Sequence, residues 1–448
     1  MRQVICAWGS LLIITLCCPD IHAAWSYSSD FFTMDLSGSF RSVNAGIRNY
    51  EDPALFGENN TYDGFSQSIL RVTSDGIVKE TVRYEIHVVN EIYAAPSSSF
   101  LLPGSTQSRS ATTRYRITKP AWYLAEDSDF SVTMNADRMN MQVSFPSVDF
   151  TLGRQAINFS QAYFWNPLDV FLPFAPESFD RDYKPGVDAL RADIILGSFS
   201  SLSLVGSTGR RLSVQISDGE SHVTAQDFGE DLWYATALVA RYRTTLEEWD
   251  LSIQAGKIYG GYQIGTGFSG EIGPVGLRGE ASWFQARDDS SILIPDPDSP
   301  TDLRSVDLVK NHLSCVIGMD HRFENSLYLN LEYLYNTAGD DDHLFDAVLR
   351  SAIGETVSLS EHLTGLQATY DIHPLLTGGF SLIYSLSDAS SLLSPSLSYS
   401  VADESEFLAG ALLGFGKRPE PTVSSFLNPE SEFGTYPNIV YAEFKFYF

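Results

Sequence analysis

Charged side chains of both signs alternate with apolar ones in several short segments of the chain. They are Arg83, Glu85, Arg154, Arg191, Arg278 and Glu280. On the inner face of a water-filled channel, opposed rows of such charges would orient dipolar solutes and select them by charge. The alternative is that these ions pair with one another and brace a wide barrel.

The segment 159–186 combines further charges with many aromatic residues and prolines. Its charged side chains are Asp169, Glu177, Asp180, Arg181, Asp182 and Lys184, and its aromatic ones include Phe159, Tyr163, Phe164, Trp165, Phe171, Phe174 and Phe179. A segment this apolar is expected to pack rather than trail in water. If it folds into a channel, it narrows the bore and brings its charges to the constriction. Otherwise it stacks as a cap on the outer rim.

The elements that must position these residues are β-strands, because apolar and polar residues alternate with a period of two. Short links follow alternate strands and long links fall between them, which is typical of a transmembrane barrel with tight periplasmic turns and large external loops. A soluble sandwich would also alternate, but without this rhythm of links. We predict 18 strands, with 16 or 20 if one hairpin is misassigned, at 32–44, 65–73, 80–94, 130–145, 148–158, 187–196, 199–207, 231–243, 249–259, 262–272, 275–285, 309–321, 326–336, 361–372, 375–386, 393–402, 406–415 and 437–448.

Both ends of the chain fit export to a bacterial outer membrane. Residues 1–24 carry one basic residue, a short apolar run and small residues at the expected cut, which predicts a cleaved signal peptide before a barrel of residues 25–448. The last strand alternates and places Phe444, Phe446 and Phe448 on one edge. It resembles the terminal signal by which outer-membrane barrels are recognised by their insertion machinery.

Composition excludes several classes of protein. The mean hydropathy is -0.08 and no long apolar stretch follows the signal, so any membrane span must be built of strands. The formal net charge of -27 disfavours nucleic acid as a partner. The histidines show no pattern with serine or aspartate that resembles an acyl-transfer or barrel-protease site, so we expect no enzyme activity, no catalytic residues and no cofactor.

Two long links are rich in aspartate, namely Asp288, Asp289, Asp296, Asp298, Asp302 and Asp307 in one and Asp340, Asp341 and Asp342 in the other. Clustered carboxylates suit Ca²⁺ or Mg²⁺, including ions that bridge the phosphates of lipopolysaccharide. The spacing of these aspartates does not match an EF-hand loop. The alternative is a solvated acidic surface without a metal site.

The stretch 152–191 reads LGRQAINFSQAYFWNPLDVFLPFAPESFDRDYKPGVDALR. Its GRQ, NPLD and KPGVDALR motifs resemble those of porin-like outer-membrane barrels, and the 18-stranded channels of the alginate-export and OprD kind are the nearest family. The resemblance implies an integral outer-membrane channel for passive, possibly selective diffusion of small hydrophilic solutes, with lipid and lipopolysaccharide around it. The alternative is an adhesion or receptor barrel that acts through its long acidic external loops.

Overall fold

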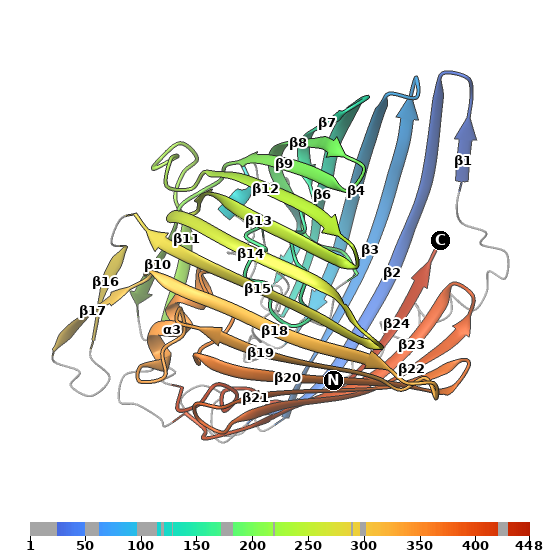
Figure 1. Cartoon of the computed structure of the whole chain (residues 1–448). Coiled ribbons are helices and arrows are strands. Elements are labelled where there is room, and N and C mark those ends of the chain that lie inside the picture. Colours follow the sequence, from blue (N-terminus) through green and yellow to red (C-terminus); the bar gives the residue numbers. More distant parts are fainter. Residues whose placement is uncertain are drawn as a thin grey trace.

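The computed structural model describes residues 25–49, 62–95, 114–117, 121–127, 129–171, 182–217, 220–287, 290–295, 302–419 and 429–448. Its main element is one antiparallel sheet that closes on itself, because the last strand pairs with β2 along ten residues (Figure 1). Closure leaves no open edge around the ring, which is the condition for strands to cross a lipid bilayer. No helix in these ranges is long and apolar enough to cross a membrane.

The ring contains 18 strands. In chain order they are β2 (Phe32–Arg48), β3 (Tyr62–Val78), β4 (Val82–Ala94), β6 (Phe130–Phe145), β7 (Val148–Gln155), β8 (Val187–Gly197), β9 (Ser200–Ser207), β12 (Ala237–Leu246), β13 (Trp249–Ile258), β14 (Gly261–Ile272), β15 (Val275–Ala286), β18 (His312–Arg322), β19 (Tyr328–Asn336), β20 (His362–His373), β21 (Leu376–Ser385), β22 (Ser391–Ala402), β23 (Ser405–Phe415) and β24 (Asn438–Tyr447).

Each of these strands overlaps one of the 18 predicted ones, so the predicted strand number and fold class are confirmed. The bounds differ most at β3 and β12, and β2 and β3 are each 17 residues long and extend past the end of β24. The additional length of β2 pairs with β1 (Trp25–Ser28), which lies outside the ring. Strand β12 begins later than predicted, because turns occupy residues 228–235.

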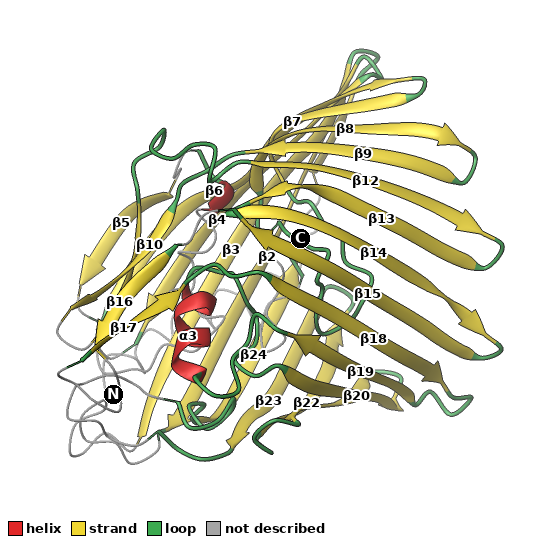
Figure 2. Ribbon diagram, turned by 60° about the vertical axis from the view of Figure 1, so that its left-hand side comes forward, coloured by secondary structure: helices red, strands yellow, loops and turns green. Residues whose placement is uncertain are grey.

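Smaller elements gather at the end of the barrel where the long links lie (Figure 2). They are β5 (Ala121–Asp127), which pairs with β6, the hairpins β10 (Leu212–Ser217) with β11 (Glu220–Ala225) and β16 (Ser291–Pro295) with β17 (Leu303–Asp307), and the helix α3 (Leu344–Ala352). We call this the external end, and the end with the short turns the periplasmic end.

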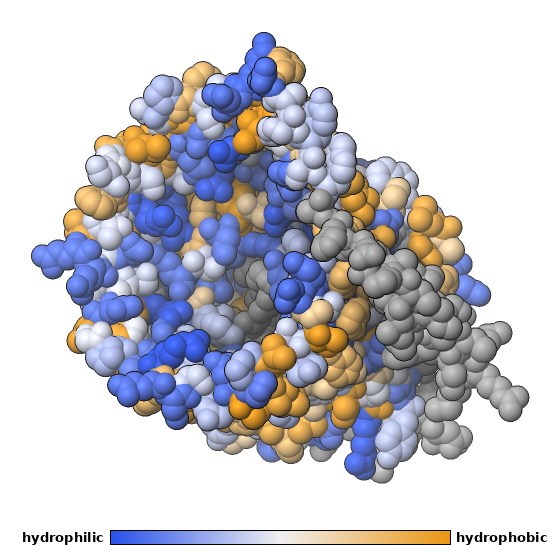
Figure 3. All heavy atoms as spheres, turned by 90° about the vertical axis from the view of Figure 1, so that its right-hand side faces the viewer, coloured by the Kyte–Doolittle hydropathy of each residue, from blue (hydrophilic) through white to orange (hydrophobic). Residues whose placement is uncertain are grey.

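The two faces of the wall differ in polarity. Outward apolar side chains are exposed, as for Ile253 at 52% and Leu397 at 45%, whereas the neighbouring inward positions carry polar groups. Seen from the periplasmic end, the molecule is hollowed at its centre, hydrophilic residues line much of the hollow, and hydrophobic residues gather around the outside (Figure 3). This is the arrangement of a lipid-facing exterior and a wet lumen.

Candidate functional site

The link between β7 and β8 packs against the inner wall of the barrel. Its described part, which we call the inner loop, comprises residues 156–171 and 182–186. Phe164, Trp165 and Leu168 in it are at most 2% exposed, and Phe164 and Trp165 belong to a buried apolar cluster with inward residues of the wall such as Leu334 and Leu363. These residues of the inner loop therefore pack on inward-facing residues of the wall.

Two carboxylates of the wall hold the first half of the inner loop by its backbone. Glu280 of β15 accepts hydrogen bonds from the backbone N–H groups of Gln161 at 2.5 Å, Ala162 at 3.3 Å and Leu168 at 3.0 Å. Glu332 of β19 accepts them from Tyr163 at 2.5 Å and Phe164 at 2.7 Å. Both glutamates are at most 3% exposed, so the loop covers them completely. A carboxylate can be buried in this way because backbone donors replace its water.

Amide and guanidinium groups of the neighbouring strands bind the carbonyl groups of the same loop. Gln254 donates to the carbonyl of Leu168 and Gln263 to that of Pro167, each at 3.0 Å. The guanidinium of Arg241 donates to the carbonyl of Phe159. Side chains of the wall thus supply hydrogen-bond partners for the backbone of the inner loop, which forms no helix or strand of its own.

Glycines in the wall make room for the loop. A Cβ at Gly365 would lie 2.6 Å from a ring carbon of Phe164, and one at Gly265 would overlap the side chain of Leu168. Since real Cβ atoms do not approach so closely, any larger residue at these two positions would displace the loop.

The second half of the inner loop reaches the last strand of the barrel. The carboxylate of Asp182 lies 2.8 Å from Lys445 Nζ and accepts a hydrogen bond from the Tyr447 hydroxyl at 3.2 Å. Tyr183 lies under the guanidinium of Arg71, 4.1 Å from its ring centre. Lys184 forms a buried ion pair with Asp169, which joins the two halves of the loop.

The charges predicted for the lumen are mostly paired. Arg154 is 2.7 Å from Asp188, Arg191 is 2.7 Å from Asp193, Glu85 is 2.6 Å from Arg138, and Arg278 pairs with Asp320. Arg83 is exposed near the turn between β3 and β4. These pairs agree with the alternative that ion pairs brace the wall. The pair of Asp182 and Lys445 differs from them, because 39% and 16% of the two side chains remain exposed.

Three of the predicted loop charges, Glu177, Asp180 and Arg181, lie outside the described residues, as do Asp288, Asp289, Asp296 and Asp298 of the first acidic link. In the second acidic link, Asp340 lies 3.5 Å from Arg350, and Asp341 accepts a hydrogen bond from the backbone of Glu361. No group of three ligands forms at the acidic links within the described ranges.

Contacts among the external elements form a second buried cluster that the sequence did not reveal. Arg114 lies 2.6 Å from Glu355 and stacks over the ring of Tyr259 at 4.0 Å. Burial raises the pKa of Glu355 although Arg114 opposes this shift.

Beside β24, Glu432 accepts hydrogen bonds from the backbone of residues 359–360. Burial raises the pKa of Glu432 to about 7, although these bonds act to lower it.

No protein-family model matches this chain, and no curated protein matches its sequence. Among solved structures, the chain is similar to OccAB1 of Acinetobacter baumannii, with a TM-score of 0.52 and 10% identity over 93% of this chain and 96% of that one. OccAB3 of the same organism gives 0.49 and 10% identity over 92% and 99%, and a mutant Rhodopseudomonas blastica porin gives 0.44 and 9% over 93% and 100%. The likeness to OccAB1 confirms the porin-like barrel predicted from the sequence, as a likeness of fold.

Proposed function

We propose that this chain is an integral barrel of a bacterial outer membrane that lets small hydrophilic solutes diffuse passively through a lumen narrowed by the inner loop. The observation that carries the proposal is the anchoring of residues 161–168 on the inward carboxylates of Glu280 and Glu332. A barrel that serves only as a frame for external loops has no need of a segment held inside its lumen. The polar interior and the exposed apolar exterior agree with this role.

Asp182 and Lys445 are the best candidates for charges that face the solute at the constriction. They pair with each other, yet both side chains remain partly exposed. Fixed charges at a narrow point select ions by sign, and salt screens them over about 10 Å at 0.1 M and about 3 Å at 1 M. The channel should therefore discriminate charged solutes at low salt and lose much of this preference at high salt.

Conductance and reversal potential in planar bilayers test the proposal. We expect the purified barrel to form open channels and Asp182→Asn to shift ion preference toward anions, because the substitution removes one fixed negative charge beside Lys445. Asp227→Asn, at an exposed position of an external loop, is the matched control and should leave the preference unchanged. An inserted barrel without conductance would reject the channel and favour the adhesion or receptor alternative.

A further inference from the structure

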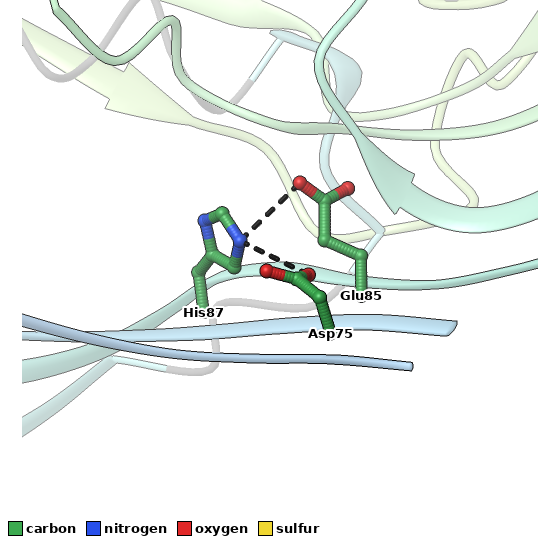
Figure 4. Close-up of side chains that lie close together, drawn as sticks. All are labelled: Asp75, Glu85 and His87. Carbon is green, nitrogen blue, oxygen red and sulfur yellow. Dashed lines mark ion pairs between the residues drawn. The ribbon is translucent and has the colours of Figure 1, made fainter. Parts of the chain in front are cut away.

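Three side chains with the chemistry of metal ligands meet on the inner wall where β3 pairs with β4 (Figure 4). Asp75 lies directly opposite Glu85 in the register of the two strands, and His87 lies two residues farther along β4. The Nε2 atom of His87 is 3.3 Å from Glu85 Oε1 and 3.6 Å from Asp75 Oδ1. One nitrogen and two oxygens therefore surround a single point.

His87 is 5% exposed, and in the described part of the chain its Nε2 atom faces the carboxylates of Glu85 and Asp75, at 3.3 and 3.6 Å. A neutral imidazole has a single N–H, so it can donate to at most one of these two carboxylates and leaves the other without that hydrogen bond. Two carboxylates opposite each other on neighbouring strands also repel. A cation held between the three groups would remove both penalties.

The spacing of the three ligand atoms fits a first-row metal. Zn²⁺ binds nitrogen and oxygen at about 2.0–2.2 Å in a tetrahedral arrangement, which places ligand atoms roughly 3.3–3.6 Å apart. The two distances from His87 already lie in this range, and all three ligand atoms lie within 4.8 Å of one another. A small rotation of the half-exposed Asp75 carboxylate would complete the triangle.

The surroundings orient the ligands and leave the local charge suited to a cation. Glu85 is fixed by Arg138 at 2.6 Å and by the Asn140 amide at 2.7 Å, the kind of outer contact that metal ligands generally make. Arg71 approaches the other ring nitrogen of His87 only at 3.5 Å, and it shares Asp137 with Arg116, at 2.8 and 3.2 Å. Arg138 balances one of the two ligand carboxylates, which leaves one formal negative charge among the three ligand side chains for a cation to compensate.

We propose that Asp75, Glu85 and His87 form a binding site for a first-row divalent metal ion such as Zn²⁺, with the fourth position open to the lumen. The imidazole ligand favours such metals over Ca²⁺ and Mg²⁺, which take oxygen ligands. The site lies near the periplasmic end of the lumen, since Asp75 is three residues from the end of β3 and its short turn. A bound ion would place two positive charges at that rim.

Calorimetric titration of ZnCl₂ into the tag-free, detergent-folded barrel at pH 7.5 tests the site without any measurement of transport. We expect one equivalent to bind with a dissociation constant in the micromolar range or tighter, in the presence of excess Mg²⁺. His87→Gln and Asp75→Asn should each weaken binding by more than about 100-fold, since the loss of outer partners alone costs 10–100-fold. Lower pH should weaken binding, because the metal competes with a proton on the imidazole.

His373→Gln is the matched control, since it removes an exposed histidine at the periplasmic end of β20. It should bind Zn²⁺ as the unchanged chain does. If the buried His87→Gln variant fails to fold, Asp75→Asn decides the matter, because the Asp75 side chain is 47% exposed. Absence of Zn²⁺ binding by the unchanged barrel, or equal binding by the folded ligand variants, would overturn the proposal and leave the channel proposal untouched.

Discussion

Replacement of Glu280 by alanine should release the inner loop from the wall. The carboxylate binds the backbone N–H groups of Gln161 and Leu168 at 2.5 and 3.0 Å and that of Ala162 at 3.3 Å. A buried donor without a partner costs about 1–3 kcal/mol, so the two shorter bonds represent about 2–6 kcal/mol of docking free energy. The substitution also removes the cost of burying the carboxylate, which offsets part of this loss. We therefore expect the docking free energy of the loop to fall by about 2 kcal/mol.

Hydrogen exchange of the loop amides measures this change directly. A loss of 2 kcal/mol corresponds to about 30-fold lower protection at residues 161–168. Single-channel conductance should rise at the same time, because the loop no longer narrows the bore at all times. Glu280→Gln should have a smaller effect, since the amide retains one acceptor oxygen but also presents a donor to the loop.

Glu271→Ala is the control, because it removes an exposed glutamate near the periplasmic end of the adjacent strand β14. It should change neither protection nor conductance. If Glu280→Ala inserts normally and keeps both the protection and the conductance of the unchanged barrel, then the carboxylate does not hold the loop and our account of the constriction is wrong.

Three further predictions concern assembly, facing and pH. Phe448→Ser should lower the yield of heat-modifiable barrel in the outer membrane but not export across the inner membrane, because Phe448 pairs with Gly38 where the ring closes. Leu397→Arg should destabilise the folded barrel by roughly 2–4 kcal/mol in urea titrations in lipid, whereas its inward neighbour Ser396→Arg should not, and equal effects would refute the facing. Glu432 has a pKa of about 7 when docked and 4.5 in its ordinary state, so its docking is strongest below pH 4.5 and weakens by roughly 3 kcal/mol as the pH rises to 7. Hydrogen-exchange protection of the backbone at residues 359–360 should therefore fall over this pH range. Constant protection would contradict the raised pKa.

The strands could be predicted because a lipid-facing barrel repeats one simple pattern. Ile253 and Leu397 recur at alternate positions with polar neighbours, and this period alone locates most of the 18 strands. The strand β5 could not be assigned from the sequence, because it pairs with β6 outside the ring and is not part of the regular series of short and long links. The sequence of 112–129 is compatible with either a hairpin or part of a loop, and Pro120 argues against a continuous central strand there.

The site was less predictable than the fold, because its contacts join distant residues. Glu280 was recognised as an inward charge, but the period of two says nothing about what covers it. Glu332 contacts Tyr163 across 169 positions of sequence, and its strand looks like any other. Ser252 and Asn330 illustrate the same limit, since both are inward and polar, as expected of a wet lumen, yet are at most 4% exposed.

The inner loop also explains how a polar lumen can hold a segment rich in aromatic residues. Glu280 and Glu332 accept the backbone N–H groups of the loop, so the backbone is satisfied without regular structure. Phe164 and Trp165 then pack on inward apolar residues of the wall, over the space left by Gly365. An aromatic loop is therefore expected to dock inside a barrel only where the wall offers hydrogen-bond acceptors, an apolar patch and glycine close to one another. These three features belong to several strands of the wall and not to the loop itself.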